Sequence, residues 1–401
     1  MGQMKKVLML IPNLGMGGAQ RSFLKVANWL NEKYEVKVVV FDRSFENIYF
    51  PHLIVEYLGE PSGAGIVSKL KNFGKRKRNL KKIKDAFKPD VSISFLEGAD
   101  YLNILSGGKE KKIISIRGSK KYDPHISGVQ GWMRKKIFIP FIYRKADLIV
   151  TASKGLEFEM QGYGVFRNKL LTIPNGYSNK EVNLAVKKHN YFIIGWAGRI
   201  SDEKGLLELL KVFAACYARD ASVRLMIVGS GNYLLEFEKE ITKVNLRYKI
   251  LKHFSSEEFS DHEIIIIDGG KEYEELLENF SVYISTSPSE GFPNVMVEVM
   301  QLGIPVISTD CKWGPREILA PGIDYDEALV YPYKTEFGIL MPLLNGSNIQ
   351  MWSNTVLELK TQLPASIKRD RIKKRVNEFD EQLVKLRWQT CIDQVINEQN
   401  R

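Results

Sequence analysis

The fold of this chain is decided by the stretch Ser287-Pro-Ser-Glu-Gly-Phe-Pro-Asn-Val-Met-Val-Glu-Val-Met-Gln-Leu-Gly-Ile-Pro-Val-Ile-Ser-Thr-Asp310. It follows an apolar run at 282–286, and Pro293 suits the first position of a helix, where a missing N–H costs nothing. The segment 303–308, Gly-Ile-Pro-Val-Ile-Ser, is typical of a helix end followed by a buried strand. The pattern therefore predicts a strand, a tight loop, a helix and a second strand.

Two carboxylates, Glu290 and Glu298, flank this predicted helix start. Unpaired N–H groups at a helix start and the helix dipole together attract anions and polar hydroxyls. If every step from Glu290 to Glu298 were helical, the backbone would advance roughly 12 Å, a scale that suits two acids binding different parts of one ligand. Taken singly, each glutamate has a simpler explanation, Glu290 as an acid favoured by the dipole and Glu298 as a solvated helix residue.

Length and composition indicate a globular protein of two domains. The 401 residues exceed the size at which single cores stop growing, and the hydrophobic fraction of 44% with 26% charged residues is that of a soluble protein. The three cysteines are far apart in the sequence and have no C-x-x-C spacing, so they support neither a disulfide framework nor a zinc site and fit a reducing compartment. A strand-like segment follows the N-terminus too closely for a signal peptide, and no apolar run could span a bilayer. We therefore expect a cytoplasmic protein.

The net charge of +11 is concentrated, because nine of the sixteen residues from Lys69 to Lys84 are Lys or Arg. Nucleic acid, an anionic membrane and a solvated face compete as explanations. Phe73 is the only aromatic residue in the run and no nucleic-acid module surrounds it, so we expect no nucleic-acid partner. A second segment, 132–145, mixes aromatic and cationic residues as bilayer interfaces do, although a buried amphipathic helix would look similar. We expect Lys69–Lys84 to contact an anionic membrane surface.

Strands and helices alternate in two series, separated by a polar stretch at 176–190. Near-continuous apolar strands favour parallel sheets covered on both faces. The sequence predicts an α/β protein with two Rossmann-like doubly wound domains, 1–180 and 190–375, which face a central cleft and bind ligand at the carboxyl ends of their strands. Residues 376–401 include a predicted helix that either packs back onto the first domain or finishes the second.

Further candidate residues follow other predicted strands. Gly198-Arg-Ile-Ser-Asp-Glu-Lys-Gly205 carries Arg199, a planar fork, and Lys204, a mobile point charge, which can converge on a diphosphate; surface Arg and Lys are also common without such a role. Gly17 and Gly18 follow the first strand, where glycine permits close approach of a ligand or simply a tight turn. Asp268 and Gly269 follow the isoleucine strand at 264–267.

As a whole, the motif from Ser287 to Asp310 resembles the Glu-x7-Glu signature of retaining glycosyltransferases of family 4, which have the GT-B fold. The resemblance extends through Trp313-Gly-Pro-Arg-Glu-Ile-Leu319 and the Gly-Arg…Lys-Gly element at 198–205. It implies that Arg199 and Lys204 hold the donor pyrophosphate, that Glu298 binds the ribose hydroxyls and that Glu290 binds the donor sugar. It further implies backbone contacts from residues of five short segments: Gly17 and Gly18; Gly198; Asp268 and Gly269; Gly291 and Phe292; Asn294 and Val295.

The first domain departs from the family pattern in two places. The loop that is usually Gly-Gly-Ala-Glu-Arg here has a glutamine at position 20. Many relatives carry a histidine after the strand at 113–116, where this chain has Arg117-Gly-Ser-Lys120 and its nearest histidine is His125. Arg117 could bind an acceptor phosphate or form a structural salt bridge.

The resemblance implies a retaining glycosyltransferase that moves a sugar from a nucleotide donor, UDP-linked, to a lipid-linked or polysaccharide acceptor at the inner face of the membrane. We expect no cofactor and no metal, because Arg199 and Lys204 can supply the charge on the diphosphate. Glu290 could act as a nucleophile, but we prefer a front-face reaction in which the leaving phosphate helps to deprotonate the acceptor. The alternatives are a GT-B-type nucleotide-sugar epimerase and a non-catalytic nucleotide-sugar-binding protein associated with membranes.

Overall fold

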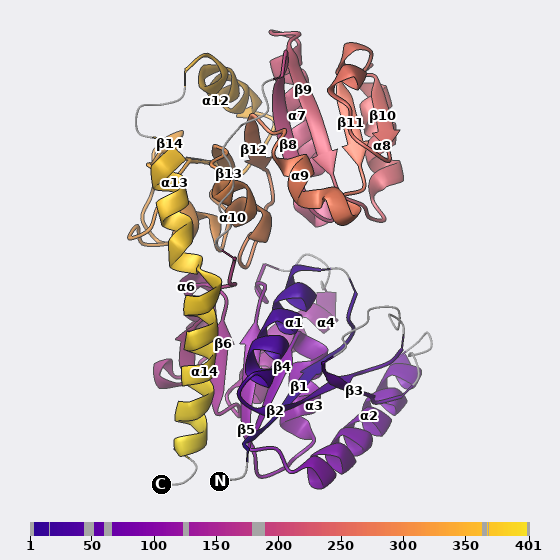
Figure 1. The fold of residues 1–401 in the computed structure, drawn as a ribbon, viewed down its shortest axis with the longest axis vertical. Coiled ribbons are helices and arrows are strands. Elements are labelled where there is room, and N and C mark those ends of the chain that lie inside the picture. The colour runs from indigo at the N-terminus through magenta and orange to yellow at the C-terminus, as the bar shows by residue number, and fades with distance from the viewer. Residues whose placement is uncertain are drawn as a thin grey trace. The chain divides into compact units, whose positions relative to one another are not determined.

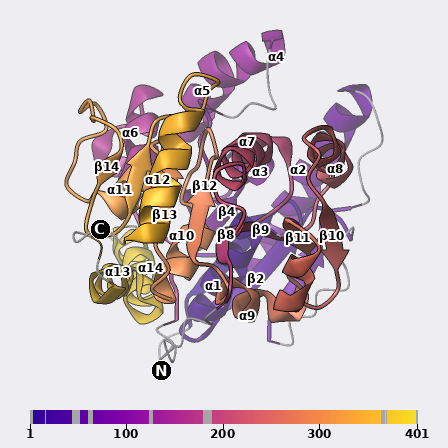
Figure 2. The same ribbon diagram turned by 90° about the horizontal axis from the view of Figure 1, so that it is seen from above.

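The computed structural model describes residues 4–15, 17–43, 52–59, 66–122, 128–178, 189–362, 367 and 369–398. The chain divides into two compact units, the first formed by residues 1–176 and 381–401 and the second by residues 177–380. Each unit is built on a sheet of parallel strands with helices on its faces (Figures 1 and 2). Residues 179–188, in the predicted polar linker, lie outside the described residues.

The first unit contains a parallel sheet in the order β3-β2-β1-β4-β5-β6-β7. Its strands are β1 (Lys6–Ile11), β2 (Glu35–Val40), β3 (Ile54–Tyr57), β4 (Val91–Phe95), β5 (Lys111–Ile116), β6 (Leu148–Thr151) and β7 (Leu170–Thr172). β1 pairs with β2 on one side and β4 on the other, so the strand order reverses beside β1. Ligands of doubly wound sheets bind beside such a reversal.

The helices of the first unit cover both faces of its sheet. They are α1 (Gly18–Asn31), α2 (Ile66–Phe87), α3 (Glu97–Leu105), α4 (Gly128–Met133), α5 (Ile139–Tyr143), α6 (Lys154–Gly162) and α14 (Glu381–Asn397), with a π-helical turn at Arg134–Phe138 between α4 and α5. In α1 the apolar residues Phe23, Val26, Ala27 and Leu30 recur with the i, i+3, i+4, i+7 spacing of a helix that lies on a sheet, and all four are buried.

The terminal helix α14 belongs to the first unit and packs its apolar side against the core of that unit (Figure 1). Val384 and Trp388 lie in one apolar cluster with strands β1, β2 and β4, and the Trp29 indole donates to Glu381 Oε1 at 3.0 Å. The sequence predicted one helix over 376–396, but the structure has α13 (Arg369–Val376), a short 3-10 turn and then α14. The helix is interrupted at Asp380, whose ψ of 137° is not helical.

The second unit contains a sheet in the order β10-β11-β9-β8-β12-β13-β15-β14, parallel except where β14 pairs with β15. Its strands are β8 (Phe192–Ala197), β9 (Val223–Val228), β10 (Tyr248–Leu251), β11 (Ile264–Ile267), β12 (Val282–Ser285), β13 (Val306–Thr309), β14 (Tyr333–Lys334) and β15 (Ile339–Met341). Its other helices are α7 (Leu206–Tyr217), α8 (Leu234–Lys243), α9 (Tyr273–Leu277), α10 (Asn294–Gln301), α11 (Pro315–Leu319) and α12 (Ile349–Thr361). The strand order reverses beside β8, which pairs with β9 and β12.

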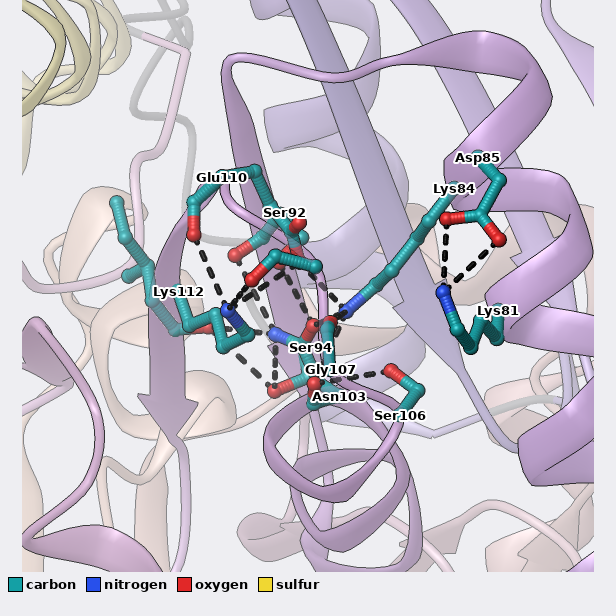
Figure 3. A network of polar contacts seen from close by, with 12 residues as sticks. Lys81, Lys84, Asp85, Ser92, Ser94, Asn103, Ser106, Gly107, Glu110 and Lys112 are labelled. Carbon is teal, nitrogen blue, oxygen red and sulfur yellow. Dashed lines mark hydrogen bonds and ion pairs between the residues drawn. The ribbon is translucent and has the colours of Figure 1, made fainter.

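The basic run Lys69–Lys84 lies on α2, and one part of the prediction for it was wrong. Lys84 does not reach a membrane surface, because its side chain is 2% exposed and its ammonium lies 2.7 Å from Glu110, which is equally buried. Figure 3 shows the network around this pair, in which Lys84 also donates to the carbonyl of Asn103 at 2.9 Å. Burial lowers the pKa of Lys84 to about 8, against the opposing charge of Glu110. Arg76 is also engaged, with Asp42 at 2.9 Å.

No helix in the described part of the chain is both long enough and apolar enough to cross a membrane.

Candidate active site

The loops that follow β8, β11 and β12 carry the residues predicted to bind the donor. β8 and β12 are neighbours in the sheet, and β11 lies two strands from β8. Because parallel strands end at one edge of a sheet, these loops gather at the carboxyl edge of the second unit, beside the reversal of strand order. The fold therefore brings together side chains that are far apart in the sequence.

Lys204 and Glu290 meet at this edge. The Lys204 ammonium lies 2.7 Å from Glu290 Oε1, and the two side chains are 27% and 12% exposed. Gly205 makes the meeting possible, since it has φ of 68° and a Cβ there would lie 2.3 Å from the carbonyl oxygen of Thr286. Thr286 Oγ1 in turn donates to the Gly205 carbonyl at 2.6 Å. The loop after β8 is thus seated directly against the end of β12.

The backbone of Glu290 is held by the segment that follows β13. Its N–H donates to the Lys312 carbonyl at 3.2 Å, and its own carbonyl accepts from the Trp313 N–H at 2.8 Å. Gly314 has φ of 91°, and a Cβ at this position would lie 2.7 Å from Pro293 Cδ. The Trp-Gly-Pro part of the sequence motif therefore supports the Glu290 loop by close backbone packing.

The helix after Glu290 begins at Asn294, so Pro293 precedes the helix instead of occupying its first position as predicted. The difference is one residue, within the usual ambiguity of helix ends. Glu290 lies in the loop and Glu298 within α10, so the eight steps between them are not all helical. Gly291 is buried, and Val295, next to Asn294, is partly buried in the first turn.

Phe292 and Asn294 are anchored inside the second unit. Phe292 is 5% exposed and its ring packs against Tyr177 and Phe379, with centroids 6.5 and 5.3 Å away. The Tyr177 hydroxyl donates to Asn294 Oδ1 at 2.6 Å. These two side chains therefore position the helix start, whose backbone is the part suited to contact a ligand.

Glu298 is held by a residue that the sequence did not single out. The Tyr273 hydroxyl donates to Glu298 Oε2 at 2.9 Å. The Tyr273 ring also lies against the loop after β11, because a Cβ at Gly269 would come within 2.7 Å of Tyr273 Cδ2. Asp268, the preceding residue, is exposed. Tyr273 thus connects the loop at Asp268 and Gly269, for which backbone contacts to the donor are predicted, with Glu298, the predicted ribose ligand.

Arg199 and Lys204 do not converge on one acid. Arg199 Nη2 lies 2.5 Å from Glu203 Oε1, and the Arg199 side chain is 64% exposed. Burial raises the pKa of Glu203, but hydrogen bonds and the charge of Arg199 outweigh this and lower the pKa to about 2. Gly229, which follows β9, lets the backbone of Gly198 approach, since a Cβ at Gly229 would lie 1.8 Å from the Gly198 carbonyl oxygen. Arg199 therefore points to a charged glutamate of its own loop.

In the first unit, Gly17 and Gly18 lie at the start of α1. Gly18 is the first helical residue, and the Gly17 carbonyl accepts from the Arg21 N–H at 2.9 Å. Gln20, which replaces the family's glutamate, donates from its amide to Asn13 Oδ1 at 3.0 Å. The substitution thus contributes a neutral contact within the loop after β1.

Arg117 is held by hydrogen bonds and aromatic contacts within the first unit. Its guanidinium donates to Ser115 Oγ at 2.9 Å and to the Ile173 carbonyl at 3.1 Å. It also lies over the rings of Phe95 and Trp388, 5.2 and 5.5 Å from their centroids. These contacts give Arg117 a structural role between β5 and α14. His125, the nearest histidine, lies outside the described residues.

A buried ionic cluster that the sequence analysis missed lies at the carboxyl edge of the first sheet. Arg134 grips Glu97 with two nitrogens, Nε at 2.7 Å from Oε1 and Nη2 at 2.6 Å from Oε2. Lys120 Nζ lies 3.6 Å from the same carboxylate. Burial raises the pKa of Glu97, but hydrogen bonds from Arg134 and the charge of Lys120 outweigh it and lower the pKa. Glu97, Lys120 and Arg134 come from three separate segments, so no local sequence pattern reveals the cluster.

Comparison with known proteins identifies the class of enzyme. Residues 16–180 match the family described as Glycosyltransferase Family 4, and residues 191–337 match the family described as Glycosyl transferases group 1. The chain belongs to glycosyltransferase family 4 and is a glycosyltransferase, as its sequence motifs predicted.

Two curated relatives illustrate the similarity. An uncharacterised glycosyltransferase of Methanocaldococcus jannaschii is 27% identical over 285 residues, which are 66% of this chain and 66% of that protein. An N-acetylgalactosamine-N,N'-diacetylbacillosaminyl-diphospho-undecaprenol 4-alpha-N-acetylgalactosaminyltransferase of Campylobacter jejuni is 24% identical and covers 88% of this chain and 91% of its own length.

Solved structures confirm the predicted GT-B fold. HepE of Anabaena, crystallised with UDP-glucose, has a TM-score of 0.74 at 18% identity and covers 97% of this chain and 99% of its own. The lipopolysaccharide outer core galactosyltransferase WaaB has a TM-score of 0.69 at 18% identity and covers 98% of this chain and 99% of its own. At these identities the likeness concerns the fold alone.

Proposed function

We propose that this glycosyltransferase is retaining and metal-independent, and that it moves a sugar from a UDP-linked donor to a lipid-linked glycan at the inner face of the cell membrane. The observation that carries the proposal is the pair of Lys204 and Glu290, 2.7 Å apart at the carboxyl edge of the second sheet. A cation and an acid in contact there suit a donor with a diphosphate at one end and a sugar at the other.

In the proposed reaction, Lys204 binds the donor pyrophosphate and neutralises the charge that grows on it as the sugar departs. Arg199 joins it by turning from Glu203, a motion that its 64% exposure allows. Backbone N–H groups at the start of α10 add positive potential beside the same phosphate. Glu290, with Lys204 withdrawn from it, orients the sugar hydroxyls.

Glu298 and the loop at Asp268–Gly269 are proposed to hold the nucleoside. A carboxylate accepts hydrogen bonds from the two ribose hydroxyls, and Tyr273 fixes the orientation of Glu298. The UDP identity of the donor is supported by HepE, whose crystals contain UDP-glucose. The retaining outcome follows the front-face route, in which the leaving phosphate accepts the acceptor proton.

The acceptor is proposed to be a polyprenyl-diphosphate-linked glycan bound by the first unit, at the loop after β1 that contains Gly17 and Gly18. The support is the relative of Campylobacter jejuni, whose name specifies a diphospho-undecaprenol acceptor. Such a substrate places the enzyme at a membrane. The exposed cations of α2 within Lys69–Lys84, such as Lys77 and Lys82, suit the anionic headgroups.

The test is transfer by the purified protein with a panel of UDP-sugars and extracted lipid-linked glycans. We expect Lys204→Ala and Glu290→Gln each to lower kcat by on the order of 100-fold or more, the first because a group aimed at transition-state charge is lost and the second because the sugar is no longer held in its reactive orientation. Lys239→Ala removes a cation from an exposed pair on α8 and serves as the control. The proposal fails if Lys204→Ala retains full activity, or if UDP is released at the same rate without acceptor, as an epimerase would do.

Two further measurements address the stereochemistry and the metal. Proton NMR of the product gives the anomeric configuration, and an inverted product would exclude the retaining route. Asp324-Tyr-Asp326 has the Asp-x-Asp spacing that metal-dependent sugar transferases of another fold use, so the metal must be tested directly. In this structure Asp324 offers its backbone carbonyl to Arg316 at 2.6 Å. We expect unchanged activity in EDTA and in Asp326→Asn.

A further inference from the structure

The segment from α4 to α5 leaves an unusual number of large apolar side chains exposed. Trp132 is 58% exposed and Phe141 is 59% exposed, and between them Met133, Ile137 and Phe138 are each at least 36% exposed. Contiguous apolar exposure of this kind marks an interaction site in a soluble protein, whereas single exposed residues do not.

The π-helical turn at Arg134–Phe138 explains why so many of these residues face outward. The backbone N–H of Ile139 donates to the carbonyl of Arg134, five residues earlier. The side chains of Arg134 and Ile139 are both buried. The wider turn adds one residue to the outer face, so that Lys136, Ile137 and Phe138 are exposed in succession. The two hydrogen bonds from the Arg134 guanidinium to the Glu97 carboxylate fix the turn with these residues facing outward.

Positive charge is interleaved with the apolar side chains. Residues 132–145 contain five Lys or Arg and no Asp or Glu. Lys136, Arg144 and Lys145 are exposed, and the Lys145 ammonium lies 3.9 Å from the centroid of the Phe141 ring. We name this surface the aromatic–basic face, formed by Trp132, Lys136, Ile137, Phe138, Phe141 and Lys145. Aromatic rings beside cations are the composition of segments that lie in the interface of an anionic bilayer.

We propose that the aromatic–basic face inserts its rings at the headgroup level of an anionic lipid bilayer, and that this contact, separate from the basic helix α2, docks the enzyme on the membrane. Charge argues for lipid over a second copy of the chain. A symmetric dimer would place the same patch against itself and so oppose its own cations. The proposal rests on the proposed lipid-linked acceptor, but it is tested without donor or acceptor, so its failure leaves the transferase proposal standing.

Trp132 provides a built-in reporter. The chain has six tryptophans, and the other five are each at most 6% exposed. We expect the emission of the full-length protein to shift to the blue with vesicles of phosphatidylcholine containing about 30% phosphatidylglycerol, and not with phosphatidylcholine alone. Trp132→Phe should abolish the spectral shift while vesicle co-sedimentation persists. A bound protein whose Trp132 emission does not move would overturn the proposal.

Substitutions inside and outside the aromatic–basic face show which part of the surface binds vesicles. The double variant Trp132→Ser with Phe141→Ser should lower the vesicle partition coefficient at least about tenfold, because both rings lose their place in the interface. Phe166→Ser is the matched control, since Phe166 is 70% exposed and lies outside the segment. Lys136→Gln with Lys145→Gln should reduce binding to anionic vesicles toward the level on neutral ones.

Three outcomes contradict the proposal: unchanged binding in the double serine variant, binding lost only when Lys77 and Arg78 of α2 are neutralised, or a dimer in sedimentation analysis that the serine variant dissociates. The last outcome assigns the face to a second copy. Circular dichroism of each variant confirms that the fold persists, so a loss of binding reports the face itself.

Discussion

The hydroxyl of Tyr273 donates a hydrogen bond to Glu298 Oε2 at 2.9 Å, and the same ring packs on the backbone at Gly269. One side chain therefore links the loop after β11 with helix α10. If Glu298 binds the ribose, the position of its carboxylate depends on this tyrosine, which acts by positioning and not by chemistry.

Tyr273→Phe removes that hydrogen bond and keeps the ring. We expect KM for the donor to rise roughly tenfold, the value of one hydrogen bond to a charged group, while kcat changes less than about twofold because the reacting bond is remote. Steady-state kinetics with varied UDP-sugar measure both. Tyr217→Phe is the matched control, since Tyr217 also bonds a glutamate, Glu263, but that residue precedes β11 at the opposite edge of the sheet. A fall in kcat with unchanged KM would contradict the positioning role.

Gly205→Ala tests the close packing of the Lys204 loop against the backbone of Thr286. The new Cβ would lie 2.3 Å from the Thr286 carbonyl oxygen at φ of 68°, and neither backbone can yield easily. We expect a loss of about 2–5 kcal/mol in the free energy of unfolding, from left-handed strain and overpacking together, measured by urea denaturation. Gly346→Ala in the same unit has nothing within 4 Å of its Cβ and should change stability little. Equal effects in the two variants would refute the close-packing argument.

The pair of Lys84 and Glu110 should be costly to break on one side. Lys84→Met leaves the buried carboxylate of Glu110 without its closest cation, and removal of one partner of a buried pair costs about 3–5 kcal/mol. The control is Lys81→Met on the same helix, because Lys81 pairs with Asp85 at 2.9 Å in solvent (Figure 3) and such pairs contribute at most about 1 kcal/mol. Chemical denaturation of both variants provides the comparison. A similar loss of unfolding free energy in Lys84→Met and Lys81→Met would show that burial of the ion pair does not raise the cost of breaking it.

Asp100 should make stability depend on pH. Burial raises its pKa from 3.8 to about 7, and the Tyr143 hydroxyl bonds its Oδ2 at 3.0 Å. The folded state therefore holds the proton more tightly than the unfolded state, so this contribution is complete below about pH 4 and is lost as the pH rises through about 7. Asp100→Asn stays neutral and should gain stability relative to wild type between about pH 5 and 8. Urea denaturation midpoints of wild type and Asp100→Asn, measured at about pH 5 and at about pH 8, test this difference in stability. Asp85→Asn, at an exposed carboxylate, is the control. If the stability of wild type and of Asp100→Asn depended on pH in the same way, the raised pKa of Asp100 would be excluded.

The sequence alone determined the local elements and the class of fold. The apolar strands and the stripe of Phe23, Val26, Ala27 and Leu30 could be predicted because burial of a strand or helix face imposes a period on neighbouring residues. The Glu-x7-Glu motif was visible for a similar reason, since its strand, loop and helix are contiguous in the chain.

Only the tertiary structure decided which distant side chains meet. Lys204 reaches Glu290 across 86 residues because β8 and β12 are adjacent, whereas Arg199 turns to Glu203 in its own loop. Tyr273, the clasp of Arg134 on Glu97 and the burial of Lys84 left no local pattern, since each depends on strand order or on helix packing. A contact between segments far apart along the chain is set by how the sheet is threaded, and that threading is a property of the whole fold.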